Sequence, residues 1–167
     1  MIAPIDLAGW IDEHQEQLRP PVGNAQIWDE GDFIITVVGG PNQRTDFHDD
    51  PCDEFFYQLR GDMVLRILEN GKPRDVRIRE GEILLIPGRC RHSPQRPAGT
   101  IGMVVEKVRP LEVNDGFEWY CPKCWALVHR VEVNVQNIVA DLPPLFDQFY
   151  RGRRECQKCG HIHPGRA

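Results

Sequence analysis

The chain has 167 residues, of which 41% are hydrophobic and 27% are charged, a composition typical of a folded globular protein and not of a disordered one. The net charge of −5 argues against bulk electrostatic binding of nucleic acid, and the short basic run 151–154 indicates a solvated loop. The sequence contains neither an apolar run long enough to cross a membrane nor a recognisable signal segment, so we expect a cytoplasmic protein.

The first predicted element is an amphipathic helix over residues 5–18. Asp6 is its expected N-cap, and the run RPPVGN (19–24) ends it. One face of this helix gathers the large side chains at helical spacing. They are Leu7, Trp10, Ile11, His14 and Leu18.

From about residue 27 to residue 108 the pattern changes to short β-rich runs that are separated by turn signals. The runs are FIITVVGG (33–40), EFFYQLRG (54–61), MVLRILENG (63–71), RDVRIREG (74–81), EILLIPG (82–88) and IGMVVEKVRP (101–110). Asn70-Gly71 is a strong hairpin signal between 63–68 and 74–79. Closely spaced strands without intervening helices predict an all-β fold, either an antiparallel sandwich or a barrel.

After Pro110 the character of the sequence changes. The segment DGFEWYCPKC (115–124) leads into a predicted strand LVHRVEV (127–133), an amphipathic segment over 134–149, and CQKCGHIHPG (156–165). We therefore expect two parts. Residues 1–110 would form a β-barrel with the N-terminal helix, and residues 111–167 a small lobe that a metal ion holds together.

The cysteines support that lobe. Four of the six form two Cys-x-x-Cys pairs, Cys121/Cys124 and Cys156/Cys159, with 31 residues between the pairs. Two such pairs can clamp one metal ion tetrahedrally, and thiolates accept either iron or zinc. A redox disulfide is the alternative, and two pairs in one small lobe make it the weaker one. Two histidines, His161 and His163, could compete as ligands, but the four cysteines already complete the count.

An acidic segment precedes the second predicted strand. RTDFHDDPCDEFFYQLRGD (44–62) holds one histidine and six carboxylates. Glu54 stands where the apolar strand begins, and a carboxylate facing a core costs free energy unless it is paired or binds a metal. A solvated acidic loop is the alternative. Further along, GEILLIPGRCRH (81–92) ends in a second candidate ligand, His92.

These two segments resemble the two conserved motifs of the cupin superfamily. Six residues separate Glu54 from Gly61, as in the first motif, and His48 stands where that motif begins its His-x-His. Asp50 replaces the second histidine. The resemblance implies a cupin barrel, a double-stranded β-helix or jelly roll, with the ligands His48, Glu54 and His92. Two imidazoles and one carboxylate form the facial triad that suits non-haem Fe(II) with open positions.

Longer strings narrow the resemblance. They closely resemble bacterial 3-hydroxyanthranilate 3,4-dioxygenases over nearly the whole chain, and they are VVGGPNQRTDFHDDPCDEFFYQLRGD (37–62), RCRHSPQRP (89–97), FEWYCPKC (117–124) and HRVEV (129–133). The resemblance implies an Fe(II) enzyme that opens the ring of 3-hydroxyanthranilate with O2. The product, 2-amino-3-carboxymuconate semialdehyde, closes to quinolinate, a precursor of NAD. A homodimer and a second iron or zinc ion in the four-cysteine lobe are implied as well.

The same resemblance implies further site residues. Arg44, Arg96 and Glu106 fall at substrate-contacting positions, and Asn24 lies on a loop near the pocket. Each arginine stands four residues from a predicted metal ligand, and arginine forks bind carboxylates such as that of the substrate. Glu106 alternates with apolar neighbours and suits hydrogen bonding or proton transfer, so it joins the three metal ligands as a catalytic candidate. An outward position on its strand is the alternative.

Two other functions stay open at this point. One is a cupin dioxygenase that acts on a different aminophenol or catechol, and the other is a metal-dependent sensor whose cysteine lobe contacts a partner. Turnover in air would separate them, because a sensor has no need of three free coordination positions.

Cys90, two residues before His92, is read as a small apolar filler, with a reactive thiol near the pocket as the alternative. The pathway, whether tryptophan catabolism, NAD synthesis or nitroaromatic degradation, stays open too.

Overall fold

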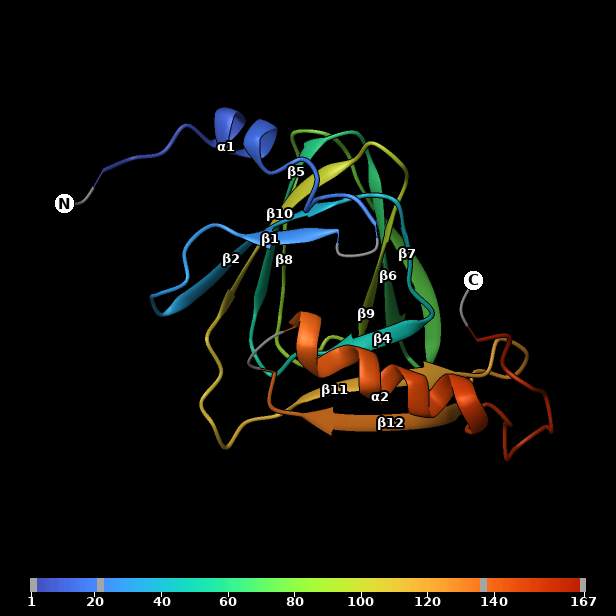
Figure 1. The fold of residues 1–167 in the computed structure, drawn as a ribbon. Helices are drawn as coiled ribbons and strands as arrows, with labels where there is room; N and C mark the ends of the chain where they lie inside the picture. Colours follow the sequence, from blue (N-terminus) through green and yellow to red (C-terminus); the bar gives the residue numbers. More distant parts are fainter. Residues whose placement is uncertain (1–2, 21–22, 136–137, 166–167) are drawn as a thin grey trace.

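The structure is a computed structural model that describes residues 3–20, 23–135 and 138–165. Within these residues the chain forms two antiparallel sheets with one short and one longer helix (Figure 1). The five-stranded sheet runs, in spatial order, through β1 (Asn24–Gln26), β2 (Phe33–Gly39), β10 (Ile101–Lys107), β5 (Glu54–Arg60) and β8 (Ile83–Ile86). The expected all-β class is therefore confirmed.

The second sheet is larger and carries most of the polar strands. It runs through β12 (Leu127–Val133), β11 (Asp115–Tyr120), β4 (Asp46–Asp49), β9 (His92–Arg96), β6 (Met63–Glu69) and β7 (Lys72–Ile78), with β3 (Asn42–Gln43) paired to β9. Neighbouring strands in this order come from distant parts of the sequence. Residues that are far apart along the chain are therefore brought to one place inside the barrel.

The apolar strands form where the sequence predicts them. All six β-rich runs become strands, and the hairpin between β6 and β7 turns at Asn70 and Gly71. Both turn residues have positive φ, 52° and 73°, which is the backbone that a two-residue hairpin of this twist requires. The side chains that alternate inward from β5, β6, β7 and β8 pack as one core. Its buried members are Phe56, Met63, Leu65, Ile67, Ile78 and Ile86.

The N-terminal helix is shorter than predicted. α1 spans Leu7–Glu13, and Asp6 caps it by accepting a hydrogen bond from the Ala8 N–H at 3.1 Å. The chain then continues as turns, so the predicted helix over 5–18 is wrong in its second half. Ile11 and Leu18 are nevertheless both buried, in a cluster with residues of β1, β2 and β10. Residues 21–22 of the predicted terminating run lie outside the described residues.

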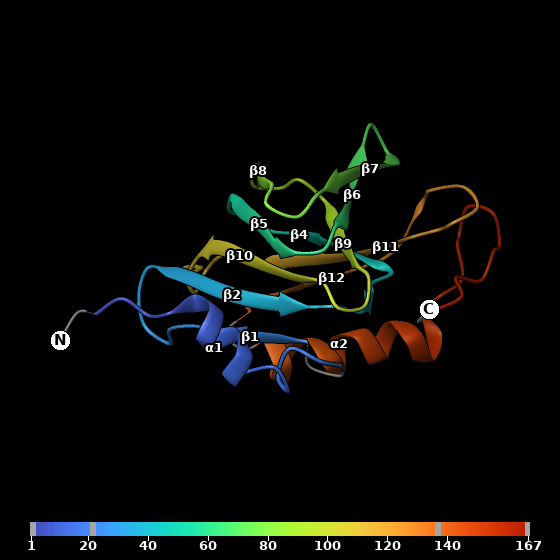
Figure 2. The same ribbon diagram turned by 90° about the horizontal axis from the view of Figure 1, so that it is seen from above.

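The second helix covers the end of the larger sheet. α2 spans Ile138–Gly152, a few residues later than the predicted segment 134–149, of which residues 136–137 lie outside the described part. Its Phe149 stacks on Trp119 of β11, with ring centroids 4.5 Å apart, and both side chains are fully buried. Figure 2 shows α2 on the same side of the barrel as β1 and α1. Neither described helix has the length and apolar character needed to span a membrane.

The sheet crosses the predicted boundary at residue 110. β11 pairs with β4, placing Phe117 opposite His48, and β12 pairs with β11. The residues that follow β12 form α2 and supply Cys156 and Cys159 to the cysteine lobe, whose other two cysteines, Cys121 and Cys124, lie between β11 and β12. The division into 1–110 and 111–167 stays a prediction, and the structure adds that two strands from beyond residue 110 extend the barrel sheet.

Candidate active site and metal centres

The structure brings His48, Glu54 and His92 together. His48 lies in β4 opposite His92, the first residue of β9, and Glu54 reaches them as the first residue of β5 in the other sheet. One side-chain ligand atom from each of the three lies within 4.8 Å of the others. His92 and Glu54 are buried, with only 1% and 4% of their surfaces exposed.

Neighbouring groups fix which ring nitrogens face the glutamate. His92 Nδ1 lies 2.8 Å from the carbonyl oxygen of Cys90, which can only accept, so we assign the proton to Nδ1. His48 Nε2 lies 2.7 Å from Oδ1 of Asp115, so its proton is assigned to Nε2. The unprotonated nitrogens of both neutral rings then face Glu54, at 2.6 Å from His92 and 3.7 Å from His48.

This arrangement fits a divalent metal ion. A lone pair on His92 and a carboxylate oxygen repel each other at 2.6 Å unless a cation or proton lies between them. Glu54 Oε2 is buried and accepts no well-oriented hydrogen bond from the described residues. Burial would raise the pKa of Glu54, but a proton on the facing imidazole of His92 outweighs burial and holds that pKa well below its usual range when no metal ion is bound. The carboxylate is therefore ready to bind a cation.

A buried arginine surrounded by carboxylates stands next to these ligands. Nη2 of Arg109 donates to Asp50, to Glu106 at 2.9 Å and to Asp115 at 2.9 Å. Together with Glu54, the cluster holds four buried carboxylates against this single arginine. Burial raises the pKa of Asp50 to about 9, although Arg109 lowers it, and Glu54 raises it further. A divalent cation would lower the cost of ionising these crowded carboxylates, which is a second reason why it fits here.

Arg96 provides a buried cation without an acidic partner. Its surface is 3% exposed, and its Nη1 donates to Gln58 Oε1 at 3.1 Å. No carboxylate among the described residues forms an ion pair with it, and its Nε donates no hydrogen bond. Burial lowers the pKa of Arg96 to about 10. A Cβ at Gly102 would lie 2.5 Å from Nη1, so the glycine makes room for this guanidinium.

Strand geometry sets the spacing between the candidate metal ligands and Arg96. Residues two apart in a strand point to the same face, so His92, Pro94 and Arg96 share the inward side of β9. Four residues of strand span roughly 13 Å between the Cα atoms of His92 and Arg96. Phe56 of β5 and Val104 of β10 are cross-strand partners on the level between them. The barrel interior thus has a metal-binding level, an apolar level and a cationic level.

The remaining predicted site residues divide between these levels. Glu106 lies directly across from Glu54, so it faces inward at the metal level and not outward. Asn24 of β1 pairs with Val38 of β2, Val38 pairs with Gly102 of β10, and Gly102 pairs with Gln58 of β5. This row across the sheet places Asn24 at the level of Arg96. Arg44 differs from these residues, because its guanidinium is paired with a neighbouring carboxylate.

Arg44 is held by a carboxylate of the chain itself. Its guanidinium binds both oxygens of Asp46, two residues later, and Asp46 is only 1% exposed. Burial opposes the charge on Arg44, but Asp46 outweighs it and raises the pKa of Arg44. Arg44 is thus already neutralised, whereas Arg96 is not.

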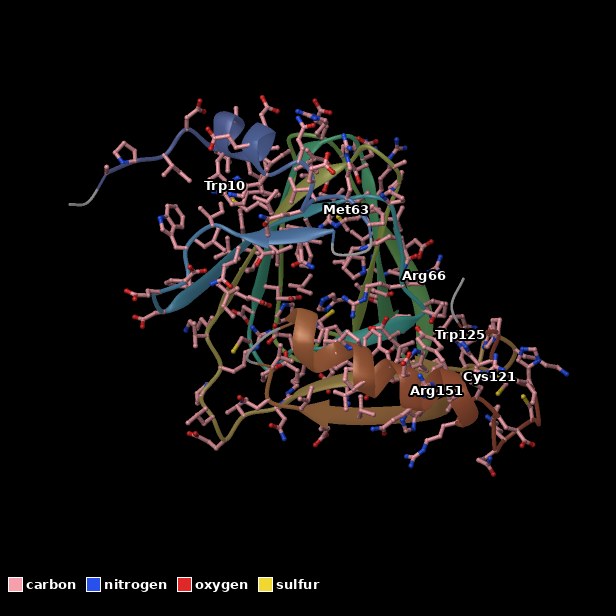
Figure 3. All side chains as sticks on the ribbon, in the orientation of Figure 1. Trp10, Met63, Arg66, Cys121, Trp125 and Arg151 are labelled. Atoms are coloured by element: carbon pink, nitrogen blue, oxygen red, sulfur yellow. The ribbon has the colours of Figure 1, made fainter. Side chains whose placement is uncertain are left out.

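The four cysteines converge at the far end of β11. Cys121 and Trp125 lie beyond that strand, at the opposite side of the molecule from Trp10 (Figure 3). Cys121 Sγ lies 3.6 Å from Cys159 Sγ, and Cys124 Sγ lies 3.6 Å from Cys156 Sγ. Four sulfurs placed tetrahedrally at about 2.3 Å from one ion are about 3.8 Å apart, whereas a disulfide requires about 2.0 Å. The geometry fits a metal ion and excludes disulfides between these pairs.

The two Cys-x-x-Cys turns have matching backbones. Trp125 N–H donates to the carbonyl of Cys121 at 2.8 Å, and Gly160 N–H donates to that of Cys156 at 2.8 Å. Both donors occupy the left-handed region, with φ of 57° and 68°. Burial would raise the pKa of the Cys156 thiol, but backbone hydrogen bonds from Lys158 and Cys159 lower it to about 7. The backbone N–H of Ala126 lowers the pKa of Cys124, but burial and hydrogen bonds from the other cysteines outweigh it and raise that pKa to about 12. The lobe thus favours a thiolate at Cys156, and a metal ion would be needed to ionise Cys124.

Several residues of the site carry no clear sequence signal. Asp115, the first residue of β11, and Arg109, in the loop after β10, lie far from the ligand motifs along the chain and reach the site only through the order of the strands. Gln58 could have been found, since Glu54, Phe56 and Gln58 alternate along one strand face. Cys90 packs partly against the main core, in agreement with the apolar-filler interpretation, and its carbonyl orients His92.

A hollow elsewhere on the surface does not involve the site. It has a volume of about 560 Å³, and its lining includes Arg89, Arg91 and Arg130. These arginines are paired with Asp49 or Glu118. None of the predicted metal or substrate residues lines this hollow, so it adds nothing to the candidate active site.

Comparisons with known proteins agree with this picture. The model of the family described as 3-hydroxyanthranilic acid dioxygenase matches residues 1–150. A 3-hydroxyanthranilate 3,4-dioxygenase from Shewanella woodyi is 59% identical over 99% of this chain and 89% of its own length. One from Burkholderia lata is 58% identical over 98% of this chain and 96% of its own.

Among solved structures, protein NMB1881 from Neisseria meningitidis is similar with a TM-score of 0.51 at 19% identity, covering 63% of this chain and 99% of its own. At that identity the likeness concerns the fold alone. The fold and the convergent ligand set define a small all-β protein of the cupin class with two candidate metal centres. The chain belongs to the 3-hydroxyanthranilic acid dioxygenase family.

Proposed function

We propose that this protein opens the aromatic ring of 3-hydroxyanthranilate with O2, giving 2-amino-3-carboxymuconate semialdehyde, the precursor of quinolinate and NAD. Relatives named 3-hydroxyanthranilate 3,4-dioxygenase match nearly the whole chain at 51–59% identity, which supports the reaction class and the substrate. Fe(II) is the proposed catalytic metal, held by His48, Glu54 and His92, because two imidazoles and a carboxylate suit that ion.

The unpaired buried cation Arg96 carries the substrate assignment. A buried guanidinium without an anion is costly, and a bound carboxylate would offset that cost through a charge-assisted bidentate contact. The ring carboxylate of 3-hydroxyanthranilate supplies such an anion, on the ring carbon next to the one that bears the amino group. Arg44 is proposed as a second contact to the substrate carboxylate. Its guanidinium gains less from that contact than Arg96 does, because Asp46 already forms an ion pair with it.

The chain's own residues orient the substrate and handle its proton. Fe(II), when bound, supplies the route by which electrons pass from the electron-rich ring to O2. Arg96 holds the carboxylate and so fixes which ring carbon faces the metal. Glu106, opposite Glu54 and tied to Arg109, is the proposed acceptor of the proton that the substrate hydroxyl gives up. Asn24, on the level of Arg96, is proposed to contact the substrate as well.

The first test measures O2 uptake by protein that has been loaded with Fe(II) without air. We expect stoichiometric uptake on adding 3-hydroxyanthranilate, with quinolinate as the final product, and no uptake by Glu54→Ala. No uptake by the iron-loaded wild type would refute the substrate assignment.

A second test isolates Arg96. Arg96→Gln should lower kcat/KM by about 100-fold for 3-hydroxyanthranilate, because a buried charged contact contributes about 2–3 kcal/mol. The matched control is 2-aminophenol, which has no ring carboxylate. Its turnover should change less than threefold, and an equal loss for both substrates would show that Arg96 does not read the carboxylate.

The four-cysteine lobe is proposed to hold iron or zinc in a structural role. The lobe has few apolar residues of its own beyond those that α2 covers, and a thiolate-bound ion can supply the missing stability. Thiolate ligation of this kind belongs to a reducing compartment, which supports our proposal of a cytoplasmic location. The proposed division at residue 110 then separates the ligand-bearing strands from the segment that this metal stabilises.

We also propose a homodimer, formed through the outer face of the five-stranded sheet. Phe55 lies between Val105 and Leu85 across the sheet, and all three point away from the core. Ile83 and Leu85 are 64% and 62% exposed, and a hollow of about 400 Å³ lies on this face. Exposed contiguous apolar surface of this kind marks an interface.

The dimer proposal is tested by the mass in solution. Leu85→Glu should convert a dimer of the wild type to a monomer in light-scattering chromatography. Leu127→Glu, at another exposed apolar residue on β12, is the matched control and should leave the mass unchanged. A monomeric wild type, or dissociation by both variants, would refute this surface.

A further inference from the structure

The carboxylates around the active site could bind a metal in more than one way. Besides His48/Glu54/His92, two other groups bring their ligand atoms within 4.8 Å of one another, namely His48/Asp50/Asp115 and Asp50/Glu54/Glu106. Both alternatives contain Asp50, which is two residues from His48 and 2% exposed. On distance and burial alone, Asp50 therefore belongs to two candidate ligand groups, as Glu54 does.

Arg109 separates the three groups. It contacts two carboxylates in each alternative, Asp50 with Asp115 in one and Asp50 with Glu106 in the other. It contacts none of the side chains of the His48/Glu54/His92 group in the described ion pairs and hydrogen bonds. The arginine side chain is 3% exposed, so water does not screen these pairs.

Asp50 is held at both of its oxygens. Oδ1 accepts from the backbone N–H of Cys52 at 2.7 Å, and Oδ2 accepts from Nη2 of Arg109. A carboxylate that is engaged in this way has to break an ion pair before it can ligate a metal. Oε2 of Glu106 and Oδ1 of Asp115 accept hydrogen bonds from the same nitrogen, Nη2 of Arg109.

We propose that Arg109 is a positioning residue that keeps Asp50 off the catalytic metal, so that the protein supplies three ligands and leaves the other coordination positions open. This inference rests on the proposed Fe(II) site at His48, Glu54 and His92. It makes no use of the substrate assignment. Any further ligand of the iron needs an open coordination position. Carboxylates that could fill such a position lie nearby, and the cation Arg109 keeps Asp50 from doing so.

The test removes the cation and keeps the shape. Arg109→Met has a side chain of similar length without charge, and Arg109→Lys is the charge-retaining control. The probes are Fe(II), in competition with a chromophoric chelator, and nitric oxide, whose iron adduct is followed by electron paramagnetic resonance. Zinc occupies the cysteine lobe throughout, so that only the catalytic iron is observed.

If Arg109 withholds Asp50, Arg109→Met binds Fe(II) about tenfold more tightly, because a further charged oxygen ligand becomes available. The same variant loses most of the nitric oxide signal, because the added ligand occupies an open position. Adding Asp50→Asn to Arg109→Met restores both readouts, and Arg109→Lys resembles the wild type. A structural defect would weaken Fe(II) binding instead, so the sign of the change separates the two explanations.

Unchanged or weaker Fe(II) binding by folded Arg109→Met, with a normal nitric oxide signal, would overturn the proposal. Should that variant not fold, Asp50→Asn alone decides. The proposal requires its Fe(II) affinity and nitric oxide signal to stay within about threefold of the wild type, and a loss of 10-fold or more would show that Asp50 is a native ligand. None of these readouts uses 3-hydroxyanthranilate, so a wrong substrate assignment would leave them intact and would appear only in turnover.

Discussion

Replacing Asp115 tests how the chain orients a metal ligand from an adjacent strand. Oδ1 of Asp115 accepts from His48 Nε2 at 2.7 Å and from Arg109 Nη2 at 2.9 Å, while its Oδ2 accepts no hydrogen bond from the described residues. Asp115→Ala removes both bonds and leaves two buried donors without this acceptor, at about 1–3 kcal/mol each. Loss of such a partner to a ligating histidine lowers metal affinity by about 10–100-fold, which is about 1.4–2.8 kcal/mol.

Asp115→Asn is the informative partner variant. Its amide oxygen can occupy the place of Oδ1 and keep both hydrogen bonds, while its NH2 group replaces the oxygen that has no partner. We therefore expect less than a tenfold loss of Fe(II) affinity for Asn and a larger loss for Ala, measured by chelator competition. The control is Asp75→Ala, which removes an exposed carboxylate paired with Arg66. It should lower the free energy of unfolding by less than about 1 kcal/mol.

The outcome that refutes this reasoning is specific. If folded Asp115→Ala holds Fe(II) as tightly as the wild type, the bond from Asp115 does not orient His48. If Asn and Ala lose affinity equally, the negative charge of Asp115 matters and the hydrogen-bond geometry does not.

The remaining predictions concern stability. Gly160→Ala should destabilise the protein by about 1–2 kcal/mol in chemical denaturation, because φ is +68° and an L side chain disfavours that backbone. No atom lies within 4 Å of the added carbon, so the backbone alone accounts for this cost. Gly152→Ala, at the end of α2, should instead stabilise it by up to about 1 kcal/mol. Phe149→Ala should cost about 3–5 kcal/mol, because its fully buried ring stacks on Trp119. A strong chelator should lower the melting temperature of the wild type by more than that of a folded Cys121→Ser variant, because the variant can lose metal only from the catalytic site.

The apolar strands were predictable because their side chains alternate with the period of a strand. β4 and β9 were not, since they read as DFHD and HSPQR, mostly polar and, in β9, interrupted by Pro94. A polar strand of this kind occurs where a barrel lines a site, and the local pattern cannot distinguish it from a loop. The candidate metal ligands were identified in spite of this, because their spacing resembles a family motif.

Residues that act through pairing between distant strands had no such signal. Asp115 stands 67 residues from His48, and Arg109 stands 59 residues from Asp50. Neither spacing has meaning until the strand order is known. The end of α1 was placed too late for a related reason, since Leu18 is buried by a turn whose spacing imitates that of a helix.

β11 joins the two candidate metal centres of the molecule. Its first residue, Asp115, binds His48, and Cys121 follows its last residue, Tyr120, about 20 Å away along the strand. The strand therefore connects the His48/Glu54/His92 group with the four cysteines. A metal ion bound at the cysteine end would hold that end of the strand in place, and with it the position of Asp115. Assembly of the two centres would consequently be linked, and fraying of the strand from the cysteine end would first displace Asp115 from the imidazole of His48.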